Sequence, residues 1–144
     1  MKYTINQILA ETNHRSWLYP SKSWKYYQEW NKALFFHYRV NKDILKELVP
    51  NDLEIDEING SAWVSLVAFT MEKIRPRFLP AFPPISDFDE INLRTYVTKN
   101  GKPGVYFLSI EAGKLFSALL AKSLSGLPYE KSNINRTENS YQAN

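Results

Sequence analysis

The dipeptide Asn100-Gly101 constrains this chain more than any other feature, because two runs rich in β-branched and aromatic residues flank it. A two-residue turn of type I′ needs positive φ at both central positions, and Asn-Gly adopts it most readily. The sequence therefore predicts an antiparallel hairpin over residues 88–111. The expected cross-strand pairs are Tyr96 with Val105, Arg94 with Phe107, Asn92 with Ser109, and Glu90 with Glu111.

Side chains alternate along a strand, so this hairpin has two faces that can be considered separately. One face is mainly aliphatic and is predicted to pack on the core, with Ile91, Leu93, Thr95, Val97, Tyr106, Leu108 and Ile110. The other face mixes charges, an amide and rings, with Glu90, Asn92, Arg94, Tyr96, Val105, Phe107, Ser109 and Glu111. We interpret this second face as the wall of a ligand pocket, the alternative being an ordinary solvated or covered face. A shift of the register by one residue would exchange the two faces.

The predicted pairing of Glu90 with Glu111 has chemical consequences. Two carboxylates directly opposite each other repel unless one is protonated, a cation lies between them, or both are solvated. Arg94 lies four residues along from Glu90 on the same face, with Asn92 between them. One hypothesis is that Arg94 anchors an anionic group while Glu90 or Glu111 transfers protons. The alternative is a salt-bridged rim without a ligand.

Other segments supply the rest of the expected sheet. Residues 33–40 alternate as a strand that places His37 and Arg39 on one face. A lone histidine in a strand is more often a structural residue than a catalyst, so this interpretation is preferred for His37. Asn41 is a plausible N-cap for a helix ending before Pro50. A second Asn-Gly turn, at Asn59, joins residues 53–57 to an apolar central strand over 62–73 that contains Trp63. These patterns predict an α+β fold with a mostly antiparallel sheet.

Three further segments are interpreted by composition and spacing. Trp24, Tyr27 and Trp30 follow helical spacing, which favours core packing over stacking on nucleic-acid bases. The proline-rich residues 75–84 predict an extended connector, which either rims a pocket or is merely stiff. Residues 112–125 have the apolar spacing of a second main helix, lying on the sheet.

Composition limits the classes of function. The chain has no cysteine and two histidines, so a thiolate site is excluded and no metal site is predicted, although carboxylate-only Mg²⁺ or Ca²⁺ sites stay open. No phosphate loop, dinucleotide fingerprint or zinc signature occurs, and no cofactor is expected. The net charge of +3 comes from scattered basic residues, which gives little support for nucleic-acid binding. The absence of a long apolar run and of a signal-peptide pattern indicates a cytoplasmic protein with no membrane contact.

Several ordered motifs resemble the uncharacterised YqjF-like (DUF2071) family. The resemblance covers roughly residues 24–131, and its most specific part is Glu90-Ile91-Asn92-Leu93-Arg94-Thr95-Tyr96-Val97; the other matching motifs are Gln28-Glu29-Trp30, residues 34–38, Leu48-Val49-Pro50, residues 59–64, residues 104–107 and Leu127-Pro128-Tyr129. This family is held to be related to acetoacetate decarboxylase. The resemblance therefore implies a partial β-barrel or cone with two main helices, whose hairpin carries the polar-aromatic face toward an internal pocket.

The resemblance does not carry the decarboxylase reaction with it. Those enzymes place two adjacent lysines after a glycine-aromatic-proline segment, and the first forms a Schiff base with the substrate. The matching segment here places Tyr129 and Glu130 at those positions, and Lys131 comes too late. A nucleophilic lysine needs a lowered pKa, which a neighbouring carboxylate would oppose. Glu90 matches a pocket glutamate, so the resemblance implies a pocket without imine chemistry.

We therefore expect an N-terminal arm over residues 1–23 with a short helix, a domain over 24–131 incomplete at its C-terminus, and a polar, disordered tail over 132–144. The leading hypothesis is binding of a small anionic or carbonyl compound, with ligand-binding candidates Glu90, Asn92, Arg94, Tyr96, Phe107, Glu111, Trp63 and His37. The alternative is a non-catalytic remnant or protein-interaction module. An open sheet edge would also favour homo-oligomers.

Overall fold

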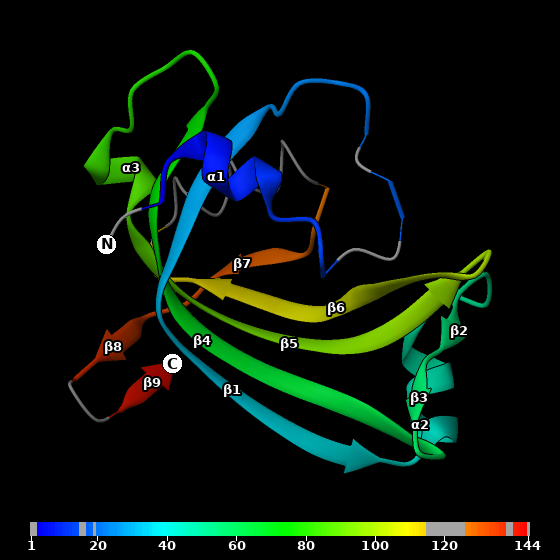
Figure 1. Ribbon diagram of the computed structural model, residues 1–144. Coiled ribbons are helices and arrows are strands. Elements are labelled where there is room, and N and C mark those ends of the chain that lie inside the picture. The colour runs from blue at the N-terminus through cyan, green and yellow to red at the C-terminus, as the bar shows by residue number, and fades with distance from the viewer. Residues whose placement is uncertain (1–2, 15–16, 19, 115–125, 138–139, 144) are drawn as a thin grey trace.

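The computed structural model describes residues 3–14, 17–18, 20–114, 126–137 and 140–143. Within them the chain forms a seven-stranded sheet, a separate two-stranded sheet and three helices (Figure 1). In chain order the elements are α1 (Ile5–Ala10), β1 (Tyr26–Val40), α2 (Lys42–Leu48), β2 (Glu54–Ile55), β3 (Glu57–Ile58), β4 (Ser61–Pro76), α3 (Pro83–Ser86), β5 (Phe88–Lys99), β6 (Lys102–Ala112), β7 (Tyr129–Lys131), β8 (Ile134–Arg136) and β9 (Tyr141–Ala143).

The large sheet has the strand order β1-β4-β5-β6-β7, with β2 added to β5 and β3 added to β4. Every pairing is antiparallel except that of β6 with β7. In the described residues the sheet stays open, with β1 at one end and β7 at the other (Figure 1). The predicted α+β class with a mostly antiparallel sheet is confirmed.

Both Asn-Gly dipeptides form the expected turns. Asn100 and Gly101 have φ of 53° and 73°, and Asn59 and Gly60 have 55° and 71°. Positive φ at both central positions is the requirement of a type I′ turn, which matches the twist of the two strands it joins. Asparagine tolerates this conformation better than most residues, and glycine adopts it without a steric cost. The two turns thereby set the hairpins β3–β4 and β5–β6.

The longest strands bend sharply partway along their length (Figure 1). The pairing of β1 with β4 is interrupted between Tyr27 and Glu29 and again between Asn31 and Leu34. Lys32, in the second interruption, has a φ of 53°, and Lys73 on β4 has a φ of 56°. An extra residue in one strand bends that strand and increases its twist. These irregularities divide the sheet into two segments.

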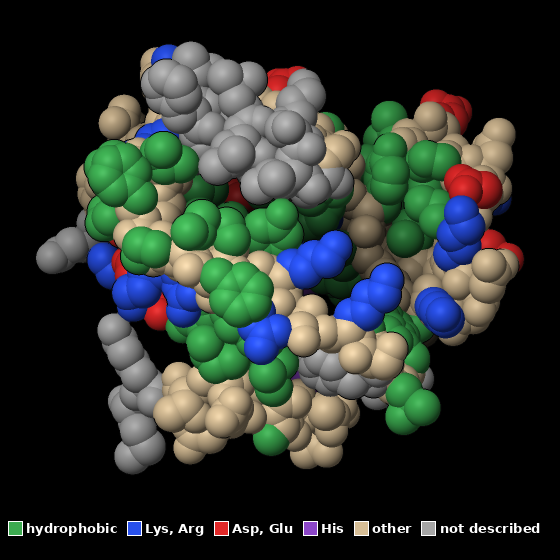
Figure 2. All heavy atoms as spheres, turned by 90° about the horizontal axis from the view of Figure 1, so that it is seen from above, with side chains coloured by type: hydrophobic (Ala, Val, Ile, Leu, Met, Phe, Trp, Pro, Cys, Tyr) green, Lys and Arg blue, Asp and Glu red, His purple; other side chains and the backbone are tan. Residues whose placement is uncertain are grey.

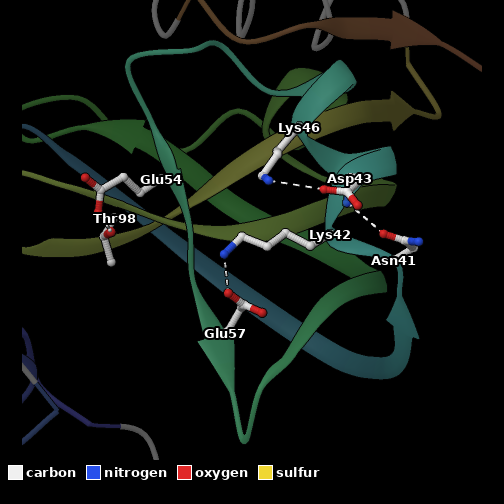
Figure 3. A network of polar contacts seen from close by, with 7 residues as sticks. All are labelled: Asn41, Lys42, Asp43, Lys46, Glu54, Glu57 and Thr98. Atoms are coloured by element: carbon white, nitrogen blue, oxygen red, sulfur yellow. Dashed lines mark hydrogen bonds and ion pairs between the residues drawn. The ribbon is translucent and has the colours of Figure 1, made fainter.

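Helix α2 is anchored by local polar contacts (Figure 3). The side chain of Asn41 accepts a hydrogen bond from the backbone N–H of Asp43, so the predicted N-cap is present. Lys42 forms an ion pair with Glu57 on β3, and Lys46 lies 3.1 Å from Asp43. These contacts fix α2 beside the short strands.

The core lies on both faces of the sheet. On one face the buried side chains cluster around the bend: Val67, Phe69, Met71, Phe88 and Ala112. On the other face Leu45 of α2 packs with Ala62 and Val64, and with the partly buried Val40, Ile55, Leu93 and Leu108. Because β4 contributes to both clusters, its predicted central position is confirmed.

Three expectations differ from the structure, and one falls outside the residues that it describes. Residues 26–30 belong to strand β1, so the helical interpretation of the ring spacing is wrong. Pairing with β4 determines the conformation of this segment. Residues 83–86 form α3 instead of an extended connector, because Pro83 occupies the first helical turn, where proline is tolerated. β8 and β9 pair within the expected disordered tail. Positions 115–125 of the second expected main helix lie outside the described residues.

The surface of the molecule carries both hydrophobic and basic side chains. Hydrophobic side chains lie beside Lys and Arg side chains on the face shown in Figure 2. No helix among the described residues is long and apolar enough to cross a membrane.

Candidate functional site

Strand register brings most of the predicted site residues onto one face of the large sheet, here called the site face. β5 contributes Glu90, Asn92, Arg94 and Tyr96. Their neighbours on this face, across β4, β1 and β6, are Trp63, Ser65, Val67, Phe69, Phe35, His37, Arg39, Val105, Phe107 and Ile110. The candidates Trp63, His37 and Phe107 therefore surround the polar row of β5, as the alternation of side chains requires.

Glu111 does not share this face, so its predicted pairing with Glu90 is wrong. Arg94 pairs with Phe107 as expected, but Leu93 pairs with Ser109. Leu108 is therefore an extra residue in β6, and beyond this bulge every side chain of β6 points to the opposite face from the predicted one. Ser109 and Glu111 consequently leave the site face.

The bulge places apolar residues of β6 beside Glu90. Ala112 pairs with Glu90 and Ile110 with Asn92, and both apolar side chains are fully buried. Ile110 was expected on the opposite, aliphatic face. Because of this single extra residue, Glu90 faces buried apolar side chains and not the predicted second carboxylate. The electrostatic environment of Glu90 changes accordingly.

Glu90 is buried, with 2 % of its surface exposed. Its Oε1 accepts a hydrogen bond of 3.0 Å from the Asn92 amide, and its Oε2 accepts one of 3.2 Å from the Tyr129 hydroxyl. Burial raises the pKa of Glu90 to about 7, against the opposing effect of both hydrogen bonds and of the Arg94 charge. At neutral pH this carboxyl is therefore divided between its protonated and ionised forms.

Tyr129 reaches Glu90 because of the same bulge. Strand β7 runs parallel to β6 and pairs Tyr129 with Ile110, so Tyr129 lies on the site face. Burial, followed by the charge and hydrogen bond of Glu90, raises the pKa of the Tyr129 hydroxyl. This hydroxyl therefore stays protonated and serves as a donor to Glu90.

Arg94 lies over an aromatic ring. Its guanidinium carbon is 5.5 Å from the centre of the Phe35 ring, within the range of a cation–π contact. The Nε atom of Arg94 is buried and has no hydrogen-bond partner among the described residues. The Oδ1 atom of Asn92 and the Nε1 atom of Trp63 have the same property within that part of the chain. Three buried hydrogen-bonding atoms on the site face thus have no partner among the described residues, which is unusual for buried polar atoms.

A second polar cluster on the site face joins three strands. Ser65 Oγ lies 2.6 Å from His37 Nδ1 and 2.7 Å from the Tyr96 hydroxyl. The His37 and Tyr96 rings are 6.4 Å apart, and His37 is also stacked on Phe35 at 6.3 Å. Because His37 has partners on two sides, a structural role accounts for its position.

Sequence reasoning missed Ser65 and Phe35 as site residues. Alternation puts Phe35 on the same face as His37 within one strand, and Ser65 on the same face as Trp63 within another, so part of the signal was present in the strand pattern. The contact between Tyr129 and Glu90 had no comparable signal, since it depends on the bulge at Leu108. Among the described residues, no group of three or more acidic or histidine side chains could hold a metal ion.

Comparison with known proteins identifies the family. The profile of DUF2071, described as an uncharacterised conserved protein, matches residues 27–144. The chain belongs to the DUF2071 family. It is 46 % identical over 110 residues to the uncharacterised protein YqjF of Bacillus subtilis (strain 168), which covers 76 % of the chain and 46 % of that relative. The resemblance noted from the sequence is therefore confirmed, and the family match includes residues 132–144.

Solved structures confirm the acetoacetate decarboxylase-like fold. An acetoacetate decarboxylase is similar with a TM-score of 0.61 and 22 % identity, over 83 % of the chain and 44 % of that protein. The enduracididine biosynthesis enzyme MppR in complex with pyruvate is similar with a TM-score of 0.59 and 15 % identity, over 87 % of the chain and 46 % of that enzyme. The DUF2071 chain thus spans less than half the length of each of these proteins.

Proposed function

We propose that the site face binds a small organic anion that carries a carbonyl or second carboxyl group. The observation that supports this most strongly is the buried Glu90 carboxyl, next to the unpartnered polar atoms of Asn92 and Arg94 in the described chain. Burial of polar atoms without partners costs about 1–3 kcal/mol each. A ligand that supplies their hydrogen bonds would recover this free energy, which favours a built binding site.

Each side chain has a separate role in this proposal. Arg94 supplies the positive charge for a ligand carboxylate, and its contact with Phe35 holds the guanidinium in place. Protonated Glu90 donates to a carbonyl oxygen, while Tyr129 and Asn92 orient the carboxyl group. The rings of Tyr96, Phe107 and Trp63 provide apolar lining.

The structural neighbours support this class of ligand. One of them, MppR, holds pyruvate, a small acid with a carbonyl next to its carboxylate. Tyr129 occupies the place that the family resemblance gives to the Schiff-base lysine, and a phenol cannot form an imine with a ketone. This supports binding without decarboxylation through an imine.

Titration with pyruvate and a panel of small 2-oxo and 3-oxo acids tests the proposal, by calorimetry or ligand-detected NMR. Arg94→Ala should weaken binding by about tenfold or more, because a hydrogen bond to a charged group contributes about 1.5–3 kcal/mol. Arg75→Ala is the matched control, since Arg75 also lies over rings, those of Trp24 and Tyr27, but away from β5. Lack of binding by any acid, or equal binding by Arg94→Ala, would refute the proposal.

The pH dependence of the same titration tests the role of Glu90. Ionised Glu90 repels an anionic ligand, so affinity should fall as pH rises through about 7, the pKa of this carboxyl. Glu90→Gln should remove this dependence and leave affinity uniform across the range. An unchanged pH profile in the variant would exclude Glu90 from ligand contact.

A further inference from the structure

Strand β1 is exposed to an unusual degree for a strand of a seven-stranded sheet. Every residue from 32 to 39 is exposed, including hydrophobic side chains on both faces of the strand. Leu34 and Phe35 are each 46 % exposed, Phe36 is 48 % exposed and Tyr38 is 56 % exposed. Isolated exposed hydrophobic residues are normal, but a contiguous run marks an interaction surface.

This run lies on an open edge. β1 is the terminal strand of the large sheet, and within the described residues it pairs only with β4. Its outer edge therefore presents N–H and C=O groups that can pair with another strand. The segment from Leu34 to Val40 contains no proline or glycine, has high β-propensity and carries one formal charge, on Arg39.

The fold limits which part of β1 can accept a partner. The bulge between Asn31 and Leu34 interrupts the edge, since an extra residue disturbs a ladder. A cavity of about 420 Å³ lies beside this bulge, and its lining joins Lys32 and Leu34 to Arg136 and Tyr141. The β8–β9 hairpin thus lies next to the bulged end, and the regular edge begins at Leu34.

We propose that a second copy of this chain pairs antiparallel with β1 over Leu34–Val40, on a two-fold axis at His37. In this register Leu34 faces the partner's Val40, Phe35 faces the partner's Arg39, and Phe36 faces the partner's Tyr38. Aliphatic residues thus meet aliphatic residues, rings meet rings, and a guanidinium meets a ring. Such a contact uses the same patch on both copies and closes as a dimer.

The second copy is the occupant that this sequence fits, because the segment is complementary to itself. No carboxylate and no lysine lies in Leu34–Val40, so the register opposes no formal like charges. The pairing also extends the site face. Phe35 carries Arg94 on its ring, and the partner's Arg39 would lie against the same Phe35. This proposal does not depend on ligand binding at Glu90.

Sedimentation velocity over a wide range of protein concentration tests the association. The average mass should rise with concentration from 16.8 kDa toward twice that value. Phe36→Asp should keep the chain monomeric at every concentration, because it places a carboxylate against the partner's Tyr38 ring, whose face repels negative charge. Phe82→Asp is the matched control, since Phe82 is 61 % exposed but lies outside the sheet, and it should dimerise as the native chain does.

Cysteine crosslinking tests the register, because the native chain contains no cysteine. His37→Cys places two thiols across the axis, where opposite Cβ atoms are about 4.5–5.5 Å apart, and it should form a disulfide-linked dimer on oxidation. Leu34→Cys is the control on the same strand. Its two thiols would be separated by about 20 Å, given the rise of about 3.4 Å per residue, and should not crosslink.

Three results would overturn the proposal. They are a native chain that stays monomeric at all concentrations, a Phe36→Asp variant that dimerises normally, and crosslinking of Leu34→Cys in place of His37→Cys. Growth into larger, open-ended assemblies would likewise contradict a closed two-fold contact.

Discussion

Strands β1 and β4 are paired along almost their whole length, and both are rich in hydrophobic residues, yet their environments differ completely. In β4, Val67 and Phe69 have no exposed surface, whereas Phe35 and Phe36 on β1 are about half exposed. The cause is topological, since in the part of the chain that the structure describes β4 has a neighbouring strand on each side and β1 has one. A hydrophobic run therefore predicts a strand, but the number of its neighbours decides how much that strand contributes to stability.

The largest expected effect is the difference in the free energy of unfolding between removing a buried ring from β4 and removing an exposed ring from β1. Phe69→Ala should lower the free energy of unfolding by about 3–5 kcal/mol, because Phe69 is fully buried and stacks on Trp30 at 4.2 Å. Phe36→Ala should cost less than about 1 kcal/mol in dilute protein, since half of its surface is already in water. Urea unfolding of both variants measures the difference.

That comparison also has a concentration-dependent form. If β1 pairs with a second copy, the cost of Phe36→Ala should increase with protein concentration, because association stabilises the folded state. The cost of Phe69→Ala should stay constant. Equal costs for the two variants in dilute protein would show that β1 is as buried as β4, contrary to the structure.

An intermediate effect is expected from the buried carboxyl of the interior strand β5. The pKa of Glu90 is raised from 4.5 to about 7, so the folded state binds more protons than the unfolded state between these values. Stability should therefore fall as pH rises through this window, by roughly 3 kcal/mol in total. Glu90→Gln should abolish this dependence of stability on pH. At the alkaline end of the pH window the variant should be more stable than the native chain.

Chemical denaturation at several pH values, from about pH 5 to about pH 8, measures this linkage. Asn92→Ala is a useful control, since it removes a donor to Glu90 while keeping the carboxyl, and its slope should persist. A native chain whose stability is flat across this window would mean that Glu90 is solvated.

The smallest effect on stability is expected from the ion pair between Glu29 of β1 and Lys73 of β4. Lys73 donates to both oxygens of Glu29 at 2.8 Å and lowers the pKa of Glu29, the opposite direction to Glu90. The stabilisation from Glu29 is therefore present above its unfolded pKa and is lost as pH falls through its folded pKa. Glu29→Gln should cost at most about 1 kcal/mol at neutral pH, because the pair still has partial access to solvent and such pairs contribute little. Loss of several kcal/mol would indicate a buried pair.

The sequence predicted the parts of the fold that local chemistry determines. Both Asn-Gly turns, the cap at Asn41 and the central position of β4 follow from short patterns whose physical cause is local. Alternation also put Glu90, Asn92, Arg94 and Tyr96 on one face of β5 before the structure was known, whereas the register that brings Trp63 beside them came from the structure.

The parts that failed depend on pairing at a distance. Nothing in the residues around Leu108 marks a bulge, since no glycine or proline is present there. The Trp24–Trp30 segment has helical spacing, but pairing with β4 outweighs that weak preference. The hairpin β8–β9 lies in a polar segment whose composition alone indicates disorder.

The bulge at Leu108 shows how one added residue can change the chemistry of a surface without replacing any side chain. Downstream of that position, β6 presents Ile110 and Ala112 where an uninterrupted strand would present Ser109 and Glu111. Insertion or deletion within this strand is therefore a route by which relatives of this chain could exchange an acidic lining for an apolar one in a single step. Alignment of relatives by sequence alone would assign the wrong residue to the site wherever such a step had occurred.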